Sequence, residues 1–339
     1  MPSPLHHAPA PPVTRGLIRG GKFAMFPHAT RAPVATFLNP DLLFHMRWLS
    51  THRQVAIAAA FLTLVPLSGL AEAQKMPEPY AGHQPFPPWN ENGKIAHQQL
   101  VEKAKQGTID VYFEGDSITR RWGATDYPEF LANWNENFHG WNCADFAWGG
   151  DSTHQILWRL QNGEFDGVHP KVIVLLAGAN NIGRGERPGC AEDAAEGVEA
   201  IVGFFREKAP DATIILTALF PRNDSPLANP LIRQVNERIK KLADGVHVRW
   251  LDMNSQLVDV NGDVRPEYVM EDHLHPSIEG YKVWAKNLVP ILEELLGPRA
   301  EVDLAPPPTG DPSVSKNKDL APDIATPEKP STGVAAPVK

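Results

Sequence analysis

A serine and a histidine that lie far apart in this sequence have the neighbours needed for chemistry on a carbonyl group. Ser117 follows Gly115-Asp116 at the end of an apolar run, and His275 lies three residues after Asp272. A serine becomes a good nucleophile when a base takes its proton, and a histidine serves best as that base when a carboxylate orients it. We therefore predict Ser117 as the nucleophile, His275 as the base and Asp272 as the residue that orients His275.

Candidate hydrogen-bond donors follow two further apolar runs. Gly150 stands in Trp148-Gly149-Gly150-Asp151-Ser152, and Asn180 stands in Gly178-Ala179-Asn180. The oxyanion formed when a nucleophile attacks an ester is stabilised by N–H groups that point at it. We predict an oxyanion hole made of the Ser117 N–H, the Gly150 N–H and the side chain of Asn180.

Each of these features also has a purely structural explanation. Gly149-Gly150 is also consistent with a plain turn, and Asn180 with a helix cap. The Asp272 and His275 pair is also consistent with a surface loop or half of a metal site. His273 competes with His275 as the base, although Met270 occupies the position where its acidic partner would stand. The agreement of four clusters, in order along the chain, favours a serine hydrolase.

The elements that must position these residues alternate between strand and helix patterns. Strands are predicted over 109–113, 144–147, 171–176, 213–217 and 246–251. Helices are predicted over 95–105, 153–160, 193–207, 231–242 and 277–296. Continuous apolar strands are typical of a parallel sheet covered on both faces. We expect one doubly wound α/β domain whose site lies at the carboxyl ends of the strands.

Composition excludes several classes of protein. The net charge of −8 argues against a nucleic-acid partner. Two cysteines exclude a disulfide scaffold and a zinc site built from cysteines. Cys143 begins the second predicted strand and Cys190 follows the end of the third, about 17 Å away along a strand. Because a disulfide needs Cα atoms within about 7 Å, we predict two free thiols.

The first part of the chain has the pattern of a secretory signal peptide. Arg47 and Arg53 precede an apolar stretch over 55–65, and Ala71-Glu72-Ala73 precedes Gln74. The apolar stretch is short for a membrane span. We predict a secreted or periplasmic protein with a true start at Met46; the alternative is a cytosolic protein with a disordered front.

The domain boundaries follow from these patterns. We expect a disordered leader and signal peptide over 1–73, an extended arm over 74–94, a hydrolase domain over 95–297 and a disordered tail over 298–339. The tail is rich in proline and poor in large apolar residues.

The motifs together resemble those of a known family. Gly115-Asp116-Ser117-Ile118, Gly150, Gly178-Ala179-Asn180 and Asp272-His273-Leu274-His275 resemble the successive blocks of the GDSL, or SGNH, hydrolases. The stretch from Trp148 to Glu164 is similar to the platelet-activating-factor acetylhydrolase-like branch. The resemblance implies a flavodoxin-like three-layer α/β/α sandwich with a five-stranded parallel sheet. It also implies hydrolysis of short acyl esters by the Ser-His-Asp triad through an acyl-enzyme, with no cofactor and no metal.

The substrate is less well defined by the sequence. Trp122, Trp148 and Trp158 near the expected site, together with export, favour an acetyl ester of a carbohydrate, although core packing explains tryptophans equally well. The alternatives are a platelet-activating-factor-like phospholipid and a non-catalytic carbohydrate-binding module. The expected partner is a small acyl ester or acetylated carbohydrate, with no nucleic acid and no stable membrane insertion after signal cleavage.

Overall fold

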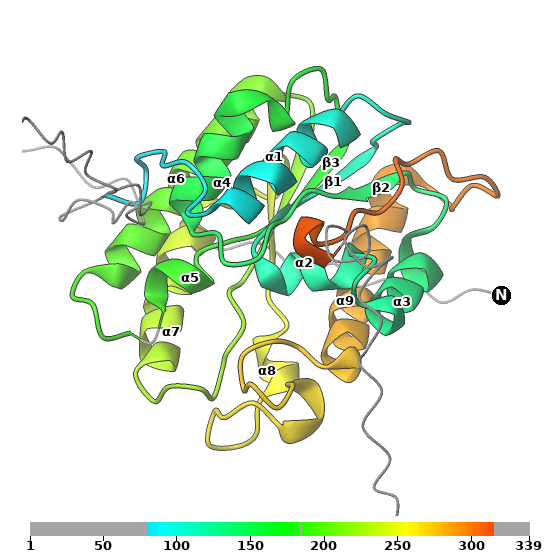
Figure 1. The fold of residues 1–339 in the computed structure, drawn as a ribbon. Coiled ribbons are helices and arrows are strands. Elements are labelled where there is room, and N and C mark those ends of the chain that lie inside the picture. Colours follow the sequence, from blue (N-terminus) through cyan, green and yellow to red (C-terminus); the bar gives the residue numbers. More distant parts are fainter. Residues whose placement is uncertain (1–80, 184, 315–339) are drawn as a thin grey trace, which may run out of the picture. The chain divides into compact units, whose positions relative to one another are not determined.

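Five parallel strands form the centre of the fold (Figure 1), which a computed structural model describes for residues 81–183 and 185–314. The strands are β1 (Val111–Gly115), β2 (Cys143–Asp145), β3 (Val172–Leu176), β4 (Thr213–Thr217) and β5 (Val248–Leu251). They pair in the order β2-β1-β3-β4-β5. The chain therefore reverses its direction of travel across the sheet between β1 and β3, where sites of doubly wound folds lie.

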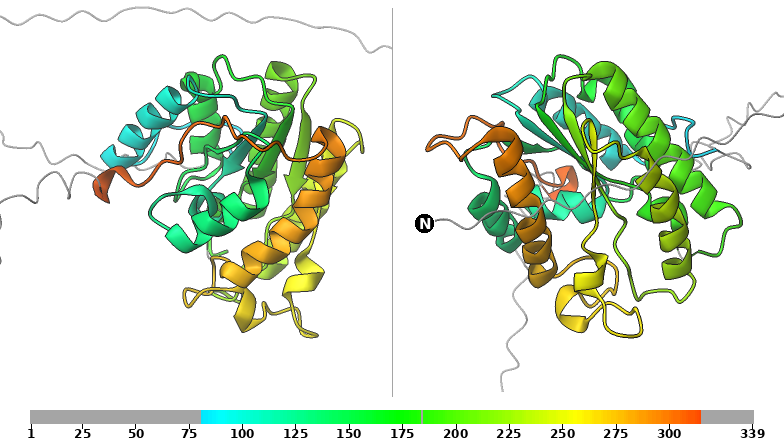
Figure 2. Two further views of the ribbon diagram at one scale, coloured as in Figure 1. Left: turned by 90° about the vertical axis from the view of Figure 1, so that its right-hand side faces the viewer. Right: turned by 180° about the vertical axis from the view of Figure 1, so that it is seen from behind.

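Helices cover both faces of this sheet and give three layers (Figures 1 and 2). One face carries α1 (Glu91–Lys103), α4 (Thr153–Arg159), α6 (Cys190–Lys208) and α7 (Ala228–Ile239). The other face carries α2 (Ser117–Gly123), α3 (Pro128–Phe138) and α9 (Ile278–Leu296). The prediction of a three-layer α/β/α sandwich with a five-stranded parallel sheet is confirmed.

Short helical segments connect the main elements. These are η1 (Leu160–Glu164), α5 (Ala179–Ile182), η2 (Lys240–Leu242), α8 (Asn254–Leu257) and η3 (Pro266–Tyr268). The α5 turn follows β3 directly and so places Asn180 at the carboxyl edge of the sheet.

Successive residues of each strand enter opposite cores. Tyr112 packs with α4 and α6, whereas its neighbours Val111 and Phe113 pack with α2, α3 and α9. All three side chains are completely buried. This burial explains why the strands are apolar at consecutive positions rather than at alternate ones.

Trp122 lies in the aromatic core and does not face a crevice. Its side chain has no exposed surface, its ring centroid is 4.9 Å from that of Trp284, and its indole N–H donates to Asn133. Trp158 is half-buried against His97, whereas the Trp148 N–H donates at 3.2 Å to the carbonyl of Gly115, two residues before Ser117. Trp122 is therefore a core residue, as the packing alternative predicted.

Several helices begin or end a few residues from their predicted bounds, and one helix was not predicted. The predicted arm over 74–94 contains the start of α1, which begins at Glu91 because the Asn90 side chain accepts a hydrogen bond from the Gly93 N–H. Helix α3 was not predicted, although Phe130, Trp134 and Phe138 recur at helical spacing and all three are buried.

Residues 298–314 are ordered, so the prediction of a disordered tail beginning at 298 is wrong for this part. The backbone of Leu304 accepts a hydrogen bond from the Thr108 N–H at 2.8 Å and donates one to the Asn142 side chain at 2.7 Å. Further along, the Thr309 carbonyl accepts from the Thr125 N–H at 3.1 Å. Hydrogen bonds of the backbone and of polar side chains hold this segment, and hydropathy does not register such bonds.

The predicted leader, its cleavage site after Ala73 and the start at Met46 lie outside the described residues, as does the predicted tail from 315 onward. Within the described part of the chain, no helix has the length and apolar character needed to cross a membrane. Cys143 and Cys190 are both buried and both free.

Candidate active site

The turn from β1 into α2 places Ser117 at the start of a helix. The Asp116 side chain caps this helix by accepting a hydrogen bond from the Ile118 N–H at 2.9 Å. A Cβ atom on Gly115 would lie 2.4 Å from the Leu176 carbonyl oxygen, so only glycine fits where β1 meets β3. The sharp turn leaves Ser117 partly exposed at the carboxyl edge of the sheet.

Ser117, His275 and Asp272 form a continuous chain of hydrogen bonds. The Nε2 atom of His275 lies 2.8 Å from Ser117 Oγ, and its Nδ1 atom lies 2.6 Å from Asp272 Oδ2. The two bonds use opposite nitrogens of the same ring, which is the arrangement that a serine, its base and an orienting carboxylate require. The structure thus brings together the three residues predicted as a triad.

A tight turn positions Asp272 on the histidine. Its second oxygen, Oδ1, accepts hydrogen bonds from the Leu274 N–H at 3.0 Å and the His275 N–H at 2.9 Å. His273 occupies the left-handed backbone region with φ of 58°, and its carbonyl accepts from the Asn223 N–H. His273 is exposed, whereas His275 is the histidine that contacts the serine.

The charges around the histidine keep it neutral and its partner ionised. Burial and the nearby Arg121 lower the pKa of His275 below its usual 6.5, although Asp272 acts in the opposite direction. For Asp272, partial burial acts to raise the pKa, but the backbone N–H bonds from His275 and Leu274 outweigh it and bring the pKa to about 2. At neutral pH the pair therefore combines a neutral imidazole with a charged carboxylate, the states that the predicted base and its predicted orienting group require.

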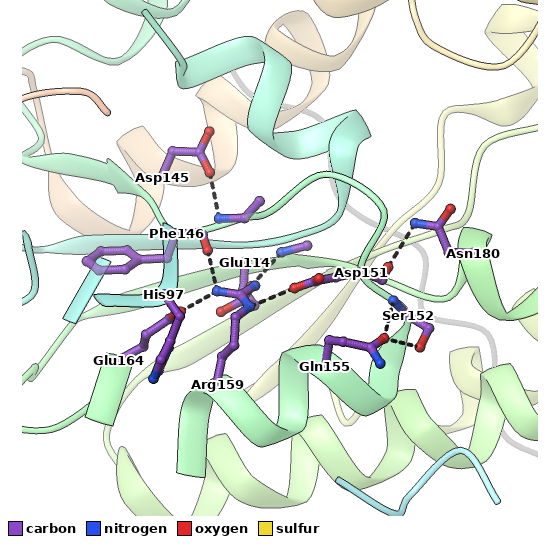
Figure 3. A network of polar contacts seen from close by, with 12 residues as sticks. His97, Glu114, Asp145, Phe146, Asp151, Ser152, Gln155, Arg159, Glu164 and Asn180 are labelled. Atoms are coloured by element: carbon purple, nitrogen blue, oxygen red, sulfur yellow. Dashed lines mark hydrogen bonds and ion pairs between the residues drawn. The ribbon is translucent and has the colours of Figure 1, made fainter. Parts of the chain in front are cut away.

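The two other predicted oxyanion donors lie beside each other. The Asn180 side-chain amide donates to the backbone carbonyl of Asp151 at 2.8 Å, and Asp151 directly follows Gly150 (Figure 3). Gly150 has φ of 83°, a conformation that other residues rarely adopt, and its backbone is exposed. The turn after β2 and the turn after β3 are thus joined by a direct hydrogen bond next to β1.

A cluster of buried charges lies behind the Gly150 turn, and the sequence analysis did not identify it (Figure 3). Arg159 has no exposed surface and contacts three carboxylates. Its partners are Glu114 on β1, Asp151 in the turn after β2 and Glu164 in η1. The available signal was a charged residue inside an otherwise apolar run, Ile156-Leu157-Trp158-Arg159-Leu160, where α4 meets η1.

Two further arginines lie near the triad. An Arg121 Nη atom is 3.4 Å from Asp272 Oδ2 and the same atom is 3.4 Å from the sulfur of Met270. Arg222 is buried, pairs with Asp224 through two bonds of 2.5 Å and reaches the Ala179 carbonyl at 3.4 Å. Among residues 81–183 and 185–314, no group of three or more His, Cys, Asp or Glu residues is arranged to hold a metal ion.

This chain is similar in sequence to a known family and to several characterised proteins. The model of the GDSL-like lipase/acylhydrolase family matches residues 113–283. The human platelet-activating factor acetylhydrolase IB subunit alpha1 is 33% identical over 204 residues, which cover 59% of this chain and 82% of that protein. The rat alpha2 subunit is 34% identical over 205 residues, covering 59% and 83%.

One solved structure matches this chain over most of its own length. A GDSL-like lipase from Bacteroides thetaiotaomicron is 20% identical with a TM-score of 0.47, over 59% of this chain and 98% of that one.

Proposed function

The chain belongs to the GDSL-like lipase/acylhydrolase family, which makes it a carboxylic ester hydrolase, and from this premise we propose that it is a serine esterase of short-chain acyl esters. The observation that carries the proposal is the hydrogen-bonded chain from Ser117 Oγ through His275 to Asp272, with distances of 2.8 and 2.6 Å. These distances are within the range for proton transfer from a nucleophile to its base.

The proposed mechanism uses one base twice. His275 Nε2 takes the Ser117 proton as Oγ attacks the ester carbonyl, and the negative charge of Asp272 stabilises the imidazolium. The oxyanion accepts hydrogen bonds from the Ser117 N–H, the Gly150 N–H and the Asn180 amide. His275 then gives its proton to the leaving alcohol. A water molecule, deprotonated by His275, then attacks the acyl-enzyme; the bond between the acyl carbon and Ser117 Oγ breaks, and His275 returns the proton to Oγ as the acid leaves.

We propose acetyl as the preferred acyl group. The similar human and rat proteins are named acetylhydrolases. The stretch from Trp148 to Glu164 also resembles the platelet-activating-factor acetylhydrolase-like branch of the family. The alcohol side has two candidates. Partial exposure of Trp148, with the Arg120 guanidinium 4.7 Å from its ring, favours an acetylated carbohydrate. The names of the relatives favour an acetyl ester of a phospholipid as the second candidate.

The test compares the wild-type protein with Ser117→Ala on p-nitrophenyl esters of increasing chain length. We expect rapid hydrolysis of the acetate, slower hydrolysis of longer esters, and a loss on the order of 10⁶ in kcat for the variant. Acetylated oligosaccharides and an acetylated ether phospholipid are then compared by kcat/KM. Equal activity of wild type and variant would rule out Ser117 as the nucleophile.

We further propose that the protein is exported, on the pattern of Arg47, Arg53, the apolar stretch 55–65 and Ala71-Glu72-Ala73. N-terminal sequencing of the mature protein is expected to begin at Gln74, and an intact leader would contradict export.

A further inference from the structure

Arg159 is the point at which two turns of the proposed site are joined. Its Nη2 atom donates to Glu114 Oε1 at 3.0 Å, and its Nε atom donates to Asp151 Oδ2 at 2.6 Å (Figure 3). Glu114 is the residue before Gly115 in the nucleophile turn, and Asp151 is the residue after Gly150 in the oxyanion turn. One rigid guanidinium therefore spans the end of β1 and the turn that follows β2.

Glu114 and Asp151, the two residues that Arg159 binds, each make a further hydrogen bond to the backbone or side chain of the proposed site. The carboxylate oxygen of Glu114 that binds Arg159 also accepts the Gly115 N–H at 3.0 Å, which fixes the backbone two residues before Ser117. The backbone carbonyl of Asp151 accepts the Asn180 amide at 2.8 Å. Arg159 also donates to the Phe146 carbonyl at 2.9 Å, just beyond the end of β2.

The cluster is fully enclosed. Arg159, Glu114 and Glu164 have no exposed surface, and Asp151 is 2% exposed. Burial acts to raise the pKa of Glu114 and of Asp151, while the positive charge of Arg159 acts to lower both. Removing the guanidinium would leave the buried carboxylates without their shared cation, which proteins tolerate poorly. Burying several charges costs desolvation free energy. The cluster lies directly behind the turn that holds Gly150, which points to a role in fixing that turn.

We propose that Arg159 is a positioning residue of the esterase: by holding Glu114 and Asp151 at once, it fixes the Gly150 N–H and the Asn180 amide relative to Ser117. This inference rests on the proposed function, because it concerns the oxyanion donors of that reaction. Arg159 does not touch the substrate. It acts by keeping the donors in place before the oxyanion forms, which is where electrostatic stabilisation of a transition state is most effective.

The chain provides a matched control within the cluster. Asp151 and Glu164 both bind Arg159, but only Asp151 belongs to the oxyanion turn. Glu164 instead binds the ring of His97, with 2.7 Å between Oε1 and Nδ1. Asp151→Asn and Glu164→Gln each remove one negative charge from the guanidinium with almost no change of shape. A role in general stability predicts similar effects of the two changes, whereas a role in positioning predicts different ones.

The experiment uses the full chain and measures kcat and KM for p-nitrophenyl acetate, with the folded fraction of each variant taken from circular dichroism. Per folded molecule, we expect Arg159→Lys to lower kcat about 10²-fold, since a lysine cannot hold two carboxylates in a fixed geometry. We expect Asp151→Asn to lower it about tenfold and Glu164→Gln by less than about twofold, with KM nearly unchanged in all three.

The proposal is overturned if Asp151→Asn keeps the wild-type kcat per folded molecule, or if Glu164→Gln loses as much as Asp151→Asn does. This comparison decides the question even if Arg159→Lys fails to fold. Ser117→Ala in the same series tests the esterase itself. An inactive Ser117→Ala with equal Asp151→Asn and Glu164→Gln effects overturns only the positioning role, whereas an active Ser117→Ala overturns the proposed function and the inference with it.

Discussion

The side-chain amide of Asn180 lies 2.8 Å from the backbone oxygen of Asp151, and this bond uses only one of its two N–H groups. The other N–H is free to meet a ligand at the exposed carboxyl edge of the sheet, where Asn180 itself is exposed. The same bond prevents the amide from rotating, because the Asp151 side chain is held in turn by Arg159. The N–H group predicted to bind the oxyanion is therefore oriented by the protein itself.

Replacing Asn180 tests this donor. We expect Asn180→Ala to lower kcat by roughly 10²–10³ on p-nitrophenyl acetate with little change in KM, because the lost bond forms only in the transition state. Asn180→Asp is expected to lose more, since a carboxylate repels the oxyanion. Wild-type kcat in Asn180→Ala would exclude this side chain from the oxyanion hole.

Replacing Asp272 tests the orienting carboxylate. We expect Asp272→Asn to lower kcat by about 10⁴, because the amide favours the tautomer of His275 that cannot accept the serine proton. The turn is expected to persist, since an amide oxygen can still accept the Leu274 and His275 N–H bonds. Kinetics and the thermal midpoint are measured together, and a loss of kcat that follows a loss of folding would contradict this role.

The pH dependence follows from the lowered pKa of His275. A base must be neutral to accept a proton, and burial together with Arg121 lowers this pKa below 6.5, so activity is retained into mildly acidic solution. Arg121→Gln removes a positive charge that opposes the imidazolium, and the acidic limb of kcat/KM is expected to move to higher pH. The control is Arg238→Gln on α7, across the sheet, which is expected to leave the limb in place. A limb that stays fixed in Arg121→Gln would contradict the prediction.

The ordered segment after α9 contributes to stability. We expect a chain that ends at Gly297 to be less stable to urea by at least about 2 kcal/mol than one that ends at Val314, because it loses several hydrogen bonds. Among them are the bond from the Gly140 N–H to Asp303 at 2.6 Å and that from the Asn92 amide to Asp311 at 2.9 Å. Equal urea midpoints for the two chains would show that the segment adds nothing.

The parts of the site that the sequence predicted are those with local geometry. Asp272 and His275 are three residues apart in one turn, so their spacing already determines that the carboxylate reaches the ring. Ser117 and Asn180 each follow a continuous apolar strand, and the rules of parallel sheets bring such strand ends to one edge. The contact of Ser117 with His275 follows from these placements.

The buried cluster could not be predicted in the same way. Arg159 meets carboxylates from β1, from the turn after β2 and from η1, and their pairing depends on how three elements pack. A charged residue in an apolar helix indicates that some partner exists, but the pattern does not specify which one. The tail was mispredicted for a related reason, since its proline-rich composition gives no sign of the backbone hydrogen bonds that hold residues 298–314.

The segment after α9 has a second consequence, which concerns other copies of the chain. β2 lies at an open side of the sheet, and residues 305–308 line the same cavity of about 250 Å³ as its three residues. An uncovered edge strand offers unpaired N–H and C=O groups to any other strand and promotes aggregation. Pro306, Pro307 and Pro308 carry no N–H to donate to a strand, and among the described residues β2 pairs with β1 alone. We therefore expect the proline-rich stretch to hinder edge-to-edge association, and we expect the chain that ends at Gly297 to aggregate at concentrations where the longer one stays dispersed.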